Sequence, residues 1–322
     1  MYRFVMKSMI MIRIAKNATA LSLLLLTLAV GCTRSVPARI SGGSADDITV
    51  VVDAFVADAS GGAATAVQIP EPTGFGTITG TITVNGNVDS SKFTAYNVNK
   101  DTSVCSNEPN RRVVVNNDGL QWGLLYYDGP FATGDPKWEH PDYLAGAGAD
   151  LSGDLAFDQK SCIFMSRIYA MRTNQVLEIK NSDTVGHNAN LAGLTSANMQ
   201  IGPSSSVTYK PAFQESKPFT VDCKAHPWMS SYIIVRDAPF FAVTGKDGSF
   251  QISNVPTGVA LPFKFWHEVL PSGAFEIKID GNVEKLSRGK FNLDPLEPGE
   301  QRELSIEIDA DLFNSALWKI NL

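Results

Sequence analysis

The sequence has little of several features that would fix a function at once. Its most apolar run, residues 18–31, spans 14 uncharged residues, which is too short to cross a bilayer comfortably. It contains no GxSxG, no HExxH and no phosphate-binding glycine loop, and no CxxCH for covalent haem. Histidine and cysteine number only four each. These absences argue against the common hydrolase, metalloprotease and nucleotide-binding classes, and we expect no catalytic residues and no enzymatic activity.

The first 31 residues have the pattern of an export signal. Four basic residues precede the apolar run, which ends in LAVGC. The small residues before Cys32 resemble the lipobox of bacterial lipoproteins, with Ala29 where that family more often has leucine. The resemblance implies cleavage after residue 31 and a lipid on Cys32. The protein is then anchored to a membrane of the bacterial cell envelope and faces the periplasm or the cell exterior. The alternative is a plain secretory signal with an incidental cysteine.

The net charge excludes one class of partner. The formal charge of −6 falls by four, to −10, once residues 1–31 are removed. A chain this acidic does not bind nucleic acid through a general basic field. A cationic protein partner is compatible with the charge.

The four cysteines differ in their surroundings. Cys32 belongs to the anchor, whereas Cys105 and Cys162 stand in stretches without other metal donors. In an oxidising compartment we expect these two to form a disulfide. Such a bond stabilises a fold by about 4 kcal/mol in the chain-entropy model. Cys223 is then left unpaired beside a histidine, and metal ligation explains an odd thiol in an exported protein.

Patterning predicts a mainly β architecture. Residues 32–73 are rich in small residues and glycine, and we interpret them as a flexible tether. From Phe75 onward, short alternating segments are separated by turn signals such as NNDG, and only ADLFNSALW near the end has helical periodicity. We expect an all-β fold, with an antiparallel Greek-key sandwich over residues 74–235 and a smaller β module over 236–322. We interpret residues 128–160 as a long loop.

The segment DCKAHPWM, residues 222–229, carries three soft or borderline metal donors at a spacing of three: Cys223, His226 and Met229. Cys223 ends the alternating segment FTVDC and shares its apolar face, so its thiol points into the predicted sandwich. His187 follows another strand and supplies a fourth donor. A thiolate, two imidazoles and a weak thioether favour copper in electron transfer. Zinc fits less well, because its usual ligands do not include thioethers.

This arrangement resembles the cupredoxins, and the C-x-x-H-x-x-M spacing with Pro227 after the histidine is most similar to amicyanin. Asn188 matches the His-Asn pair that ties the two copper loops together in many members. Asp222 departs from the aromatic residue that many members have before the cysteine. The resemblance implies a one-electron carrier with a redox-protein partner and an electron exit at the edge of the His226 ring. It implies one copper ion, cycling between Cu(I) and Cu(II), held by His187, Cys223, His226 and Met229.

Two alternatives stay open beside the electron carrier. One is a copper carrier or storage protein with the same ligands and no fast electron transfer, and the other is a metal-free structural envelope lipoprotein. Two further histidines have simpler interpretations. His267 alternates with phenylalanines in FKFWHEV, so we expect it to face the core, and we expect His140 to be solvated in the long loop.

The C-terminal third carries a second resemblance. The run from Thr244 to Gly258, TGKDGSFQISNVPTG, is similar to the carboxypeptidase regulatory-like, or transthyretin-like, module. That resemblance implies a small β-sandwich that supports or binds and seldom catalyses.

Overall fold

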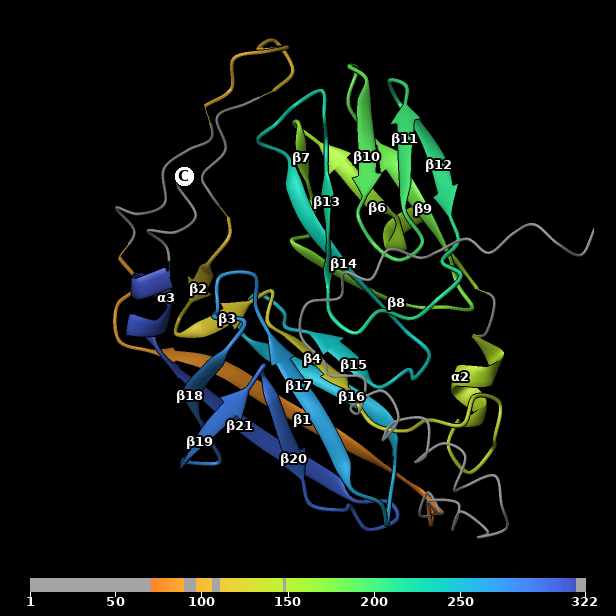
Figure 1. The fold of residues 1–322 in the computed structure, drawn as a ribbon, viewed down its shortest axis with the longest axis vertical. Coiled ribbons are helices and arrows are strands. Elements are labelled where there is room, and N and C mark those ends of the chain that lie inside the picture. The colour runs from red at the N-terminus through yellow and green to blue at the C-terminus, as the bar shows by residue number, and fades with distance from the viewer. Residues whose placement is uncertain (1–70, 90–96, 106–110, 147–148, 317–322) are drawn as a thin grey trace, which may run out of the picture. The chain divides into compact units, whose positions relative to one another are not determined.

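The computed structural model describes residues 71–89, 97–105, 111–146 and 149–316. The predicted export signal, the anchor at Cys32 and the tether as far as residue 70 lie outside these described residues. Within them the fold is all-β, as the sequence predicts, with only short helices beside the strands (Figure 1). None of the described helices is long and apolar enough to span a membrane.

Residues 149–236 form two five-stranded sheets with one shared core, which we call the two-sheet sandwich. The first sheet, in the order β11-β10-β13-β14-β8, consists of β8 (Ile168–Arg172), β10 (His187–Leu191), β11 (Ala197–Ile201), β13 (Phe219–Asp222) and β14 (Ser230–Arg236). The second, in the order β12-β9-β6-β7 with β5 beside β9, consists of β5 (Asp150–Leu151), β6 (Phe157–Lys160), β7 (Ile163–Phe164), β9 (Val176–Asn181) and β12 (Ser205–Tyr209). Strand β8 runs parallel to β14, and β5 and β6 run parallel to β9, so the sheets are mixed and not purely antiparallel.

Alternation of apolar and polar residues explains which faces are buried. In β9, Leu177 and Ile179 have no exposed surface, while Glu178 and Lys180 on the other face are partly exposed. In β13, Val221 is fully buried, and Cys223 just beyond the strand is 1% exposed. Side chains two apart on a strand share a face, so the period of two sends the cysteine into the core, as the sequence predicts.

The remaining strands form one eleven-stranded sheet around a separate core, which we call the eleven-stranded unit. Its central strand β1 pairs antiparallel with β16 and parallel with β21, and Figure 1 shows orange β1 among the blue C-terminal strands. Its early strands are β1 (Phe75–Asn85), β2 (Val114–Asn116), β3 (Gly119–Gln121) and β4 (Leu124–Tyr127). Its late strands are β15 (Phe241–Val243), β16 (Ser249–Pro256), β17 (Leu261–Trp266), β18 (Ala274–Ile279), β19 (Asn282–Ser287), β20 (Lys290–Leu293) and β21 (Gln301–Asp309).

This pairing divides the chain differently from the expected boundaries. Residues 75–127 were expected to share a domain with the metal-binding segment, yet β1 and β4 pair with strands of residues 241–309, and β2 and β3 join the same sheet through β1. The described strands of residues 241–309 therefore do not form a sheet of their own. The physical reason is that β1 and β21 pair in parallel although they lie near opposite ends of the described chain. Strand patterning carries no information on a partner so distant in sequence.

Several local predictions can be compared with the structure. The turn in NNDG joins β2 and β3, with Asn117 and Asp118 both at positive φ (47° and 67°), which is the geometry of a tight hairpin turn. The expected helix near the end is α3 (Ala310–Ala316). The expected long loop over residues 128–160 also contains helix α2 (Pro141–Ala145), a 3-10 turn (Gly153–Leu155) and strands β5 and β6. Short elements of this kind lie below what hydrophobic periodicity can resolve.

The two-sheet sandwich and the eleven-stranded unit meet in a third apolar cluster. Leu124 and Tyr126 of β4 pack with Ile168 of β8 and Ile234 of β14, all of them at most 2% exposed. A buried ion pair lies between the same two parts of the chain. Arg167 donates from Nε and Nη2 to the Glu268 carboxylate at 2.7 and 2.5 Å, and each side chain is only 5% exposed. Two such hydrogen bonds fix the geometry of the pair.

Candidate metal centre

Sheet pairing brings the two donor-bearing loops to the same end of the two-sheet sandwich. His187 is the first residue of β10, and Cys223 follows the last residue of β13. The two strands are antiparallel neighbours, with Asn190 opposite Asp222 and Leu191 opposite Val221. Because antiparallel neighbours place the start of one strand beside the end of the other, His187 and Cys223 lie close together despite their separation in sequence.

Three of the four expected donors converge. The Nδ1 atoms of His187 and His226 lie 2.9 Å apart, and Cys223 Sγ lies 3.8 Å from Nδ1 of His226. One ligand atom from each residue falls within 4.8 Å of the other two, and all three residues are at most 1% exposed. Two imidazole nitrogens at 2.9 Å cannot present bare lone pairs to each other, so a proton or a metal cation must lie between them.

Met229 closes the loop that carries the other donors. Its N–H donates to the His226 carbonyl at 2.9 Å, and its own carbonyl accepts from the Cys223 N–H at 3.2 Å. The side chain is 1% exposed and belongs to the same core cluster as Cys223. The backbone of Met229 is thus held beside the three converging donors, at the entry to β14.

Asn188 ties the two loops together. Its backbone N–H lies 3.4 Å from Cys223 Sγ, and its Oδ1 accepts hydrogen bonds from the Lys224 and Ala225 N–H groups at 2.7 and 3.3 Å. The N–H contact stabilises negative charge on the sulfur, and the amide fixes the turn that carries His226. These are the contacts expected of a residue that orients a metal loop.

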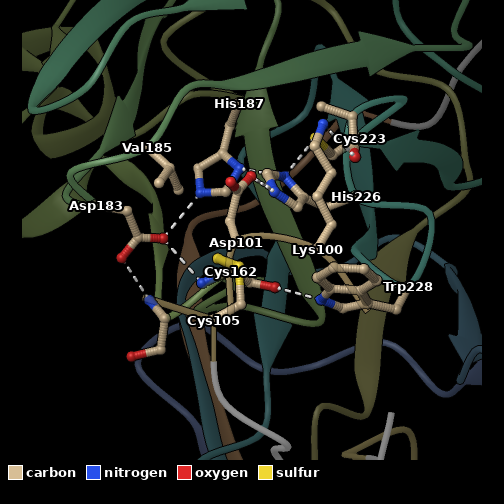
Figure 2. Close-up of a disulfide and its surroundings, with 12 residues drawn as sticks. Lys100, Asp101, Cys105, Cys162, Asp183, Val185, His187, Cys223, His226 and Trp228 are labelled. Atoms are coloured by element: carbon tan, nitrogen blue, oxygen red, sulfur yellow. Dashed lines mark hydrogen bonds and ion pairs between the residues drawn. A yellow bond between two sulfur atoms is a disulfide. The ribbon is translucent and has the colours of Figure 1, made fainter. Parts of the chain in front are cut away.

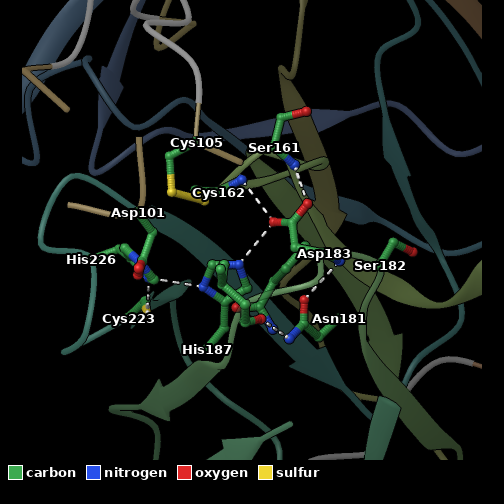
Figure 3. Close-up of polar contacts among 12 residues, drawn as sticks. Asp101, Cys105, Ser161, Cys162, Asn181, Ser182, Asp183, His187, Cys223 and His226 are labelled. Atoms are coloured by element: carbon green, nitrogen blue, oxygen red, sulfur yellow. Dashed lines mark hydrogen bonds and ion pairs between the residues drawn. A yellow bond between two sulfur atoms is a disulfide. The ribbon is translucent and has the colours of Figure 1, made fainter. Parts of the chain in front are cut away.

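Two carboxylates complete the site, and both were missed in the sequence. Asp183 Oδ2 lies 2.8 Å from His187 Nε2, and Asp101 Oδ2 lies 2.8 Å from His226 Nε2 (Figure 3). Asp183 stands four residues before His187 in a turn, which is a weak signal. Asp101 stands 125 residues before His226 and gives no sequence signal at all.

The surroundings of His187 favour a neutral imidazole, which can bind a metal. Burial lowers the pKa of His187 and the neighbouring His226 lowers it further, while the hydrogen bond to Asp183 raises it. The net direction is downward, so a nitrogen lone pair on His187 is available at neutral pH. An ionised carboxylate only accepts hydrogen bonds, so each Nε2 carries the proton and each Nδ1 turns inward.

The edge of His226 does not lie at the surface, contrary to the expectation of an electron exit there. The residue is fully buried, because Asp101 occupies its Nε2 and the segment 97–105 lies against the loop. Lys100 Nζ donates to the Ala225 carbonyl at 3.3 Å within the same contact. The half-buried Trp228 packs edge-to-face on His226, with ring centroids 5.2 Å apart.

A disulfide between Cys105 and Cys162 borders the site (Figure 2). Its sulfur atoms fall within 4.8 Å of a His226 ring nitrogen. The Trp228 indole N–H donates to the Cys162 carbonyl at 3.0 Å. Cys223 is the free cysteine of the described residues and is buried.

The other two histidines lie apart from this cluster. His267 is 1% exposed, as expected of a core-facing residue, and its Nδ1 accepts from the Val269 N–H at 3.3 Å. His140 is not simply solvated, as the sequence suggested. It caps helix α2 by accepting from the Asp142 N–H at 3.2 Å, and its ring packs on Phe75.

The donor atoms fit a soft or borderline transition metal. A thiol and two imidazoles are ligand types that such metals take, and the donor atoms lie 2.9 Å (Nδ1 to Nδ1) and 3.8 Å (Sγ to Nδ1 of His226) apart. The cluster is buried, its histidines are oriented by carboxylates and its thiol contacts a backbone N–H. A metal site with oriented ligands has this organisation.

Comparison with known proteins gives weak similarity to cupredoxins. No family model and no curated protein sequence match the chain. A reduced variant of amicyanin is 15% identical, covers 35% of this chain and 98% of its own, and has a TM-score of 0.23. A second reduced amicyanin variant is 16% identical over 36% of this chain and 99% of its own, also at 0.23. The purple cupredoxin of Nitrosopumilus maritimus is 16% identical over 23% of this chain and 81% of its own, at 0.20. At these TM-scores the likeness does not identify the site, whose chemistry follows from its own geometry.

Proposed function

We propose that the chain is a copper-binding protein that transfers single electrons through a type 1 site. The observation that carries the proposal is the convergence of the buried His187, His226 and Cys223 donor atoms within 4.8 Å of one another in the two-sheet sandwich. Two imidazoles and one thiolate, with a nearby methionine, are the donor set that favours copper in electron transfer. Bound copper supplies the one-electron step between Cu(I) and Cu(II).

Each residue of the site has a separate task in this proposal. Cys223 would supply the thiolate, which the Asn188 N–H stabilises, and the two histidines would supply imidazole nitrogens. Met229 would supply a weak thioether donor. Burial excludes water and holds the donors in one arrangement, which suits both oxidation states equally and keeps the reorganisation on electron transfer small.

The experiment that tests the proposal is addition of Cu(II) to protein that lacks residues 1–31. We expect one equivalent to bind and an intense visible band from thiolate-to-copper charge transfer. Cys223→Ser removes the thiolate and should abolish the band. His267→Ala should leave it unchanged, because His267 lies outside the cluster. If the wild type takes up no copper at neutral pH, or Cys223→Ser keeps the wild-type spectrum, the metal-free envelope lipoprotein replaces this proposal.

We also propose that the protein is exported and anchored to a membrane of the cell envelope through lipid on Cys32. Support comes from the basic N-terminus, the short apolar run and the LAVGC sequence. The formal charge of −10 after cleavage supports a cationic redox protein as partner and argues against nucleic acid. In detergent-free buffer, the Cys32→Ala variant should no longer be found in the membrane fraction. A variant that remains there contradicts the anchor.

One observation favours a second function, a copper carrier or storage protein. The His226 edge is covered by Asp101 and the segment 97–105, so a partner cannot reach the ring directly. Covering slows exchange of electrons and of copper alike. Electron self-exchange measured on the copper-loaded protein separates the two functions: fast exchange supports the electron carrier, and slow exchange with slow copper release supports storage.

A further inference from the structure

The two histidines of the site are each held from behind by a carboxylate that is itself tied to the disulfide. On one side, Asp183 Oδ2 contacts His187 Nε2 at 2.8 Å and accepts from the Cys162 N–H at 2.8 Å. Its other oxygen accepts from the Ser161 N–H at 2.7 Å. Asp183 is 6% exposed, so it has little contact with solvent beyond these partners.

The other side repeats the arrangement with the other half of the disulfide. Asp101 Oδ2 contacts His226 Nε2 at 2.8 Å, and the Asp101 carbonyl accepts from the Cys105 N–H at 2.9 Å. The Val104 N–H donates to the same carbonyl at 2.9 Å. The turn of residues 101–105 therefore couples the position of Cys105 directly to that of the Asp101 side chain.

Together these contacts form a closed ring. Starting at Cys162, it runs through Asp183, His187, His226, Asp101 and Cys105, and the Cys105–Cys162 bond closes it (Figures 2 and 3). The links between residues are contacts of 2.8–2.9 Å between named polar atoms, and the last link is covalent. The covalent link joins the segment 97–105, from outside the two-sheet sandwich, to the loop after β6.

We propose that the Cys105–Cys162 disulfide is a brace for the histidine pair, and that Asp101 and Asp183 are positioning residues that set the imidazole tautomer. The brace holds both Nε2–H groups on carboxylates and so directs both Nδ1 atoms toward Cys223. Its value for copper rests on the proposed function, whereas the tautomer and the position of the rings do not.

The physical reason is preorganisation. A histidine that donates its outer N–H to a carboxylate is fixed in rotation and is a more basic ligand, and loss of such a partner typically weakens metal binding about 10- to 100-fold. Asp101 belongs to the segment 97–105, which contributes no strand to either sheet of the two-sheet sandwich. Besides the disulfide, that segment is held by the Lys100 hydrogen bond and by packing of Val98 and Val104. The disulfide is the covalent restraint on this arrangement.

The first measurement uses metal-free protein, so that it is independent of copper. Nitrogen NMR of the imidazole rings should show protonated Nε2 on both His187 and His226, with slow exchange of the Nε2 protons. Cys105→Ser/Cys162→Ser should accelerate that exchange at least tenfold on both rings. Asp101→Ala should do so on His226 alone, and Asp101→Asn, which keeps an acceptor oxygen, should have a smaller effect.

The second measurement is copper affinity, with a control for lost stability. Leu304→Ala lowers stability by opening a cavity in the eleven-stranded unit, where Leu304 is 1% exposed, and leaves the brace intact. We expect copper affinity to fall about 10- to 100-fold in the disulfide variant and in Asp101→Ala, and to be unchanged in folded Leu304→Ala.

The outcomes separate the brace from the proposed function. A bare Nε2 on either ring of the wild type, or unchanged proton exchange in the disulfide variant, overturns the brace even if copper binds with full colour. Nε2 protonation and exchange as expected, without copper uptake by the wild type, supports the brace and overturns the proposed function. Because Asp101→Ala retains the disulfide, its result decides the matter if the double cysteine variant does not fold.

Discussion

The histidine pair of the two-sheet sandwich and His267 of the eleven-stranded unit are equally buried but differ in their surroundings. His187 and His226 face each other, a thiol and two carboxylates. His267 accepts one hydrogen bond from a backbone N–H, and its ring packs against the Phe313 ring with centroids 5.4 Å apart. Its Nε2 has no hydrogen-bond partner among the described residues. Burial alone therefore does not mark a site. Convergence of several donors on one point does, because only convergence can hold a cation.

The difference also appears in the protonation of the rings. Burial, with Arg167 nearby, lowers the pKa of His267 to about 3, and nothing near it compensates. For His187, the Asp183 hydrogen bond opposes the effect of burial. A lone buried histidine is a neutral core residue that resists protonation. A histidine with a carboxylate behind it keeps its outer proton and directs its other nitrogen to a ligand.

The largest expected effect concerns the ion pair between the two parts of the chain. Glu268→Ala removes the carboxylate from a buried guanidinium, and we expect a loss of about 3–5 kcal/mol in the free energy of unfolding. Denaturant unfolding measures it. Glu307→Ala, in the exposed pair with Lys278, is the matched control and should change stability little. Equal losses of unfolding free energy in the two variants would contradict the conclusion that the buried pair contributes more than the exposed one.

Removal of a converging histidine comes next. His187→Ala and His226→Ala each delete one of three strong donors, so copper affinity should fall by more than about 100-fold, or about 2.7 kcal/mol. Titration with a competing chelator measures this change. His140→Ala and His267→Ala serve as controls and should bind copper as the wild type does. A loss of copper affinity in His267→Ala would contradict the conclusion that only the converging histidines bind the metal.

Acid tests the lone histidine. Its folded pKa of about 3 lies below the value of 6.5 for a free histidine, so the unfolded state binds more protons between these values. Stability from this group is complete above pH 6.5 and is lost as pH falls, by about 2 kcal/mol at pH 5. His267→Asn keeps an acceptor for the Val269 N–H and should lack this part of the pH dependence. Unfolding curves at pH 7 and pH 5, with His140→Asn as control, decide whether it does.

The smallest effect is expected at Met229. Met229→Leu replaces a weak donor with a side chain of similar volume, so copper and colour should remain, with affinity reduced less than about tenfold. The reduction potential should rise. Met171→Leu, in the same core and fully buried, should leave the potential unchanged. Voltammetry of the copper-loaded proteins compares them, and a lower potential in Met229→Leu would be the contrary result.

The sequence by itself determined the local features. The period of two in FTVDC sends Cys223 inward, NNDG makes a hairpin turn, and the alternation in FKFWHEV buries His267. The spacing of Cys223, His226 and Met229 put three donors on one short loop. Each of these follows from steric and hydrophobic rules that act within a few residues, so the pattern of the chain was enough.

Only the tertiary structure decided which distant segments meet. The pairing of β1 with β21 and of β4 with β15 and β17 places strands β1 to β4 in the eleven-stranded unit and not in the two-sheet sandwich. The contact of Asp101 with His226 covers the ring that was expected to be exposed, and Asp183 and the disulfide complete the support behind the histidines. Most of these contacts join residues far apart in sequence, and none of them leaves a periodic trace in the chain. They exist because folding brings the segments together, where a buried polar group must find a partner.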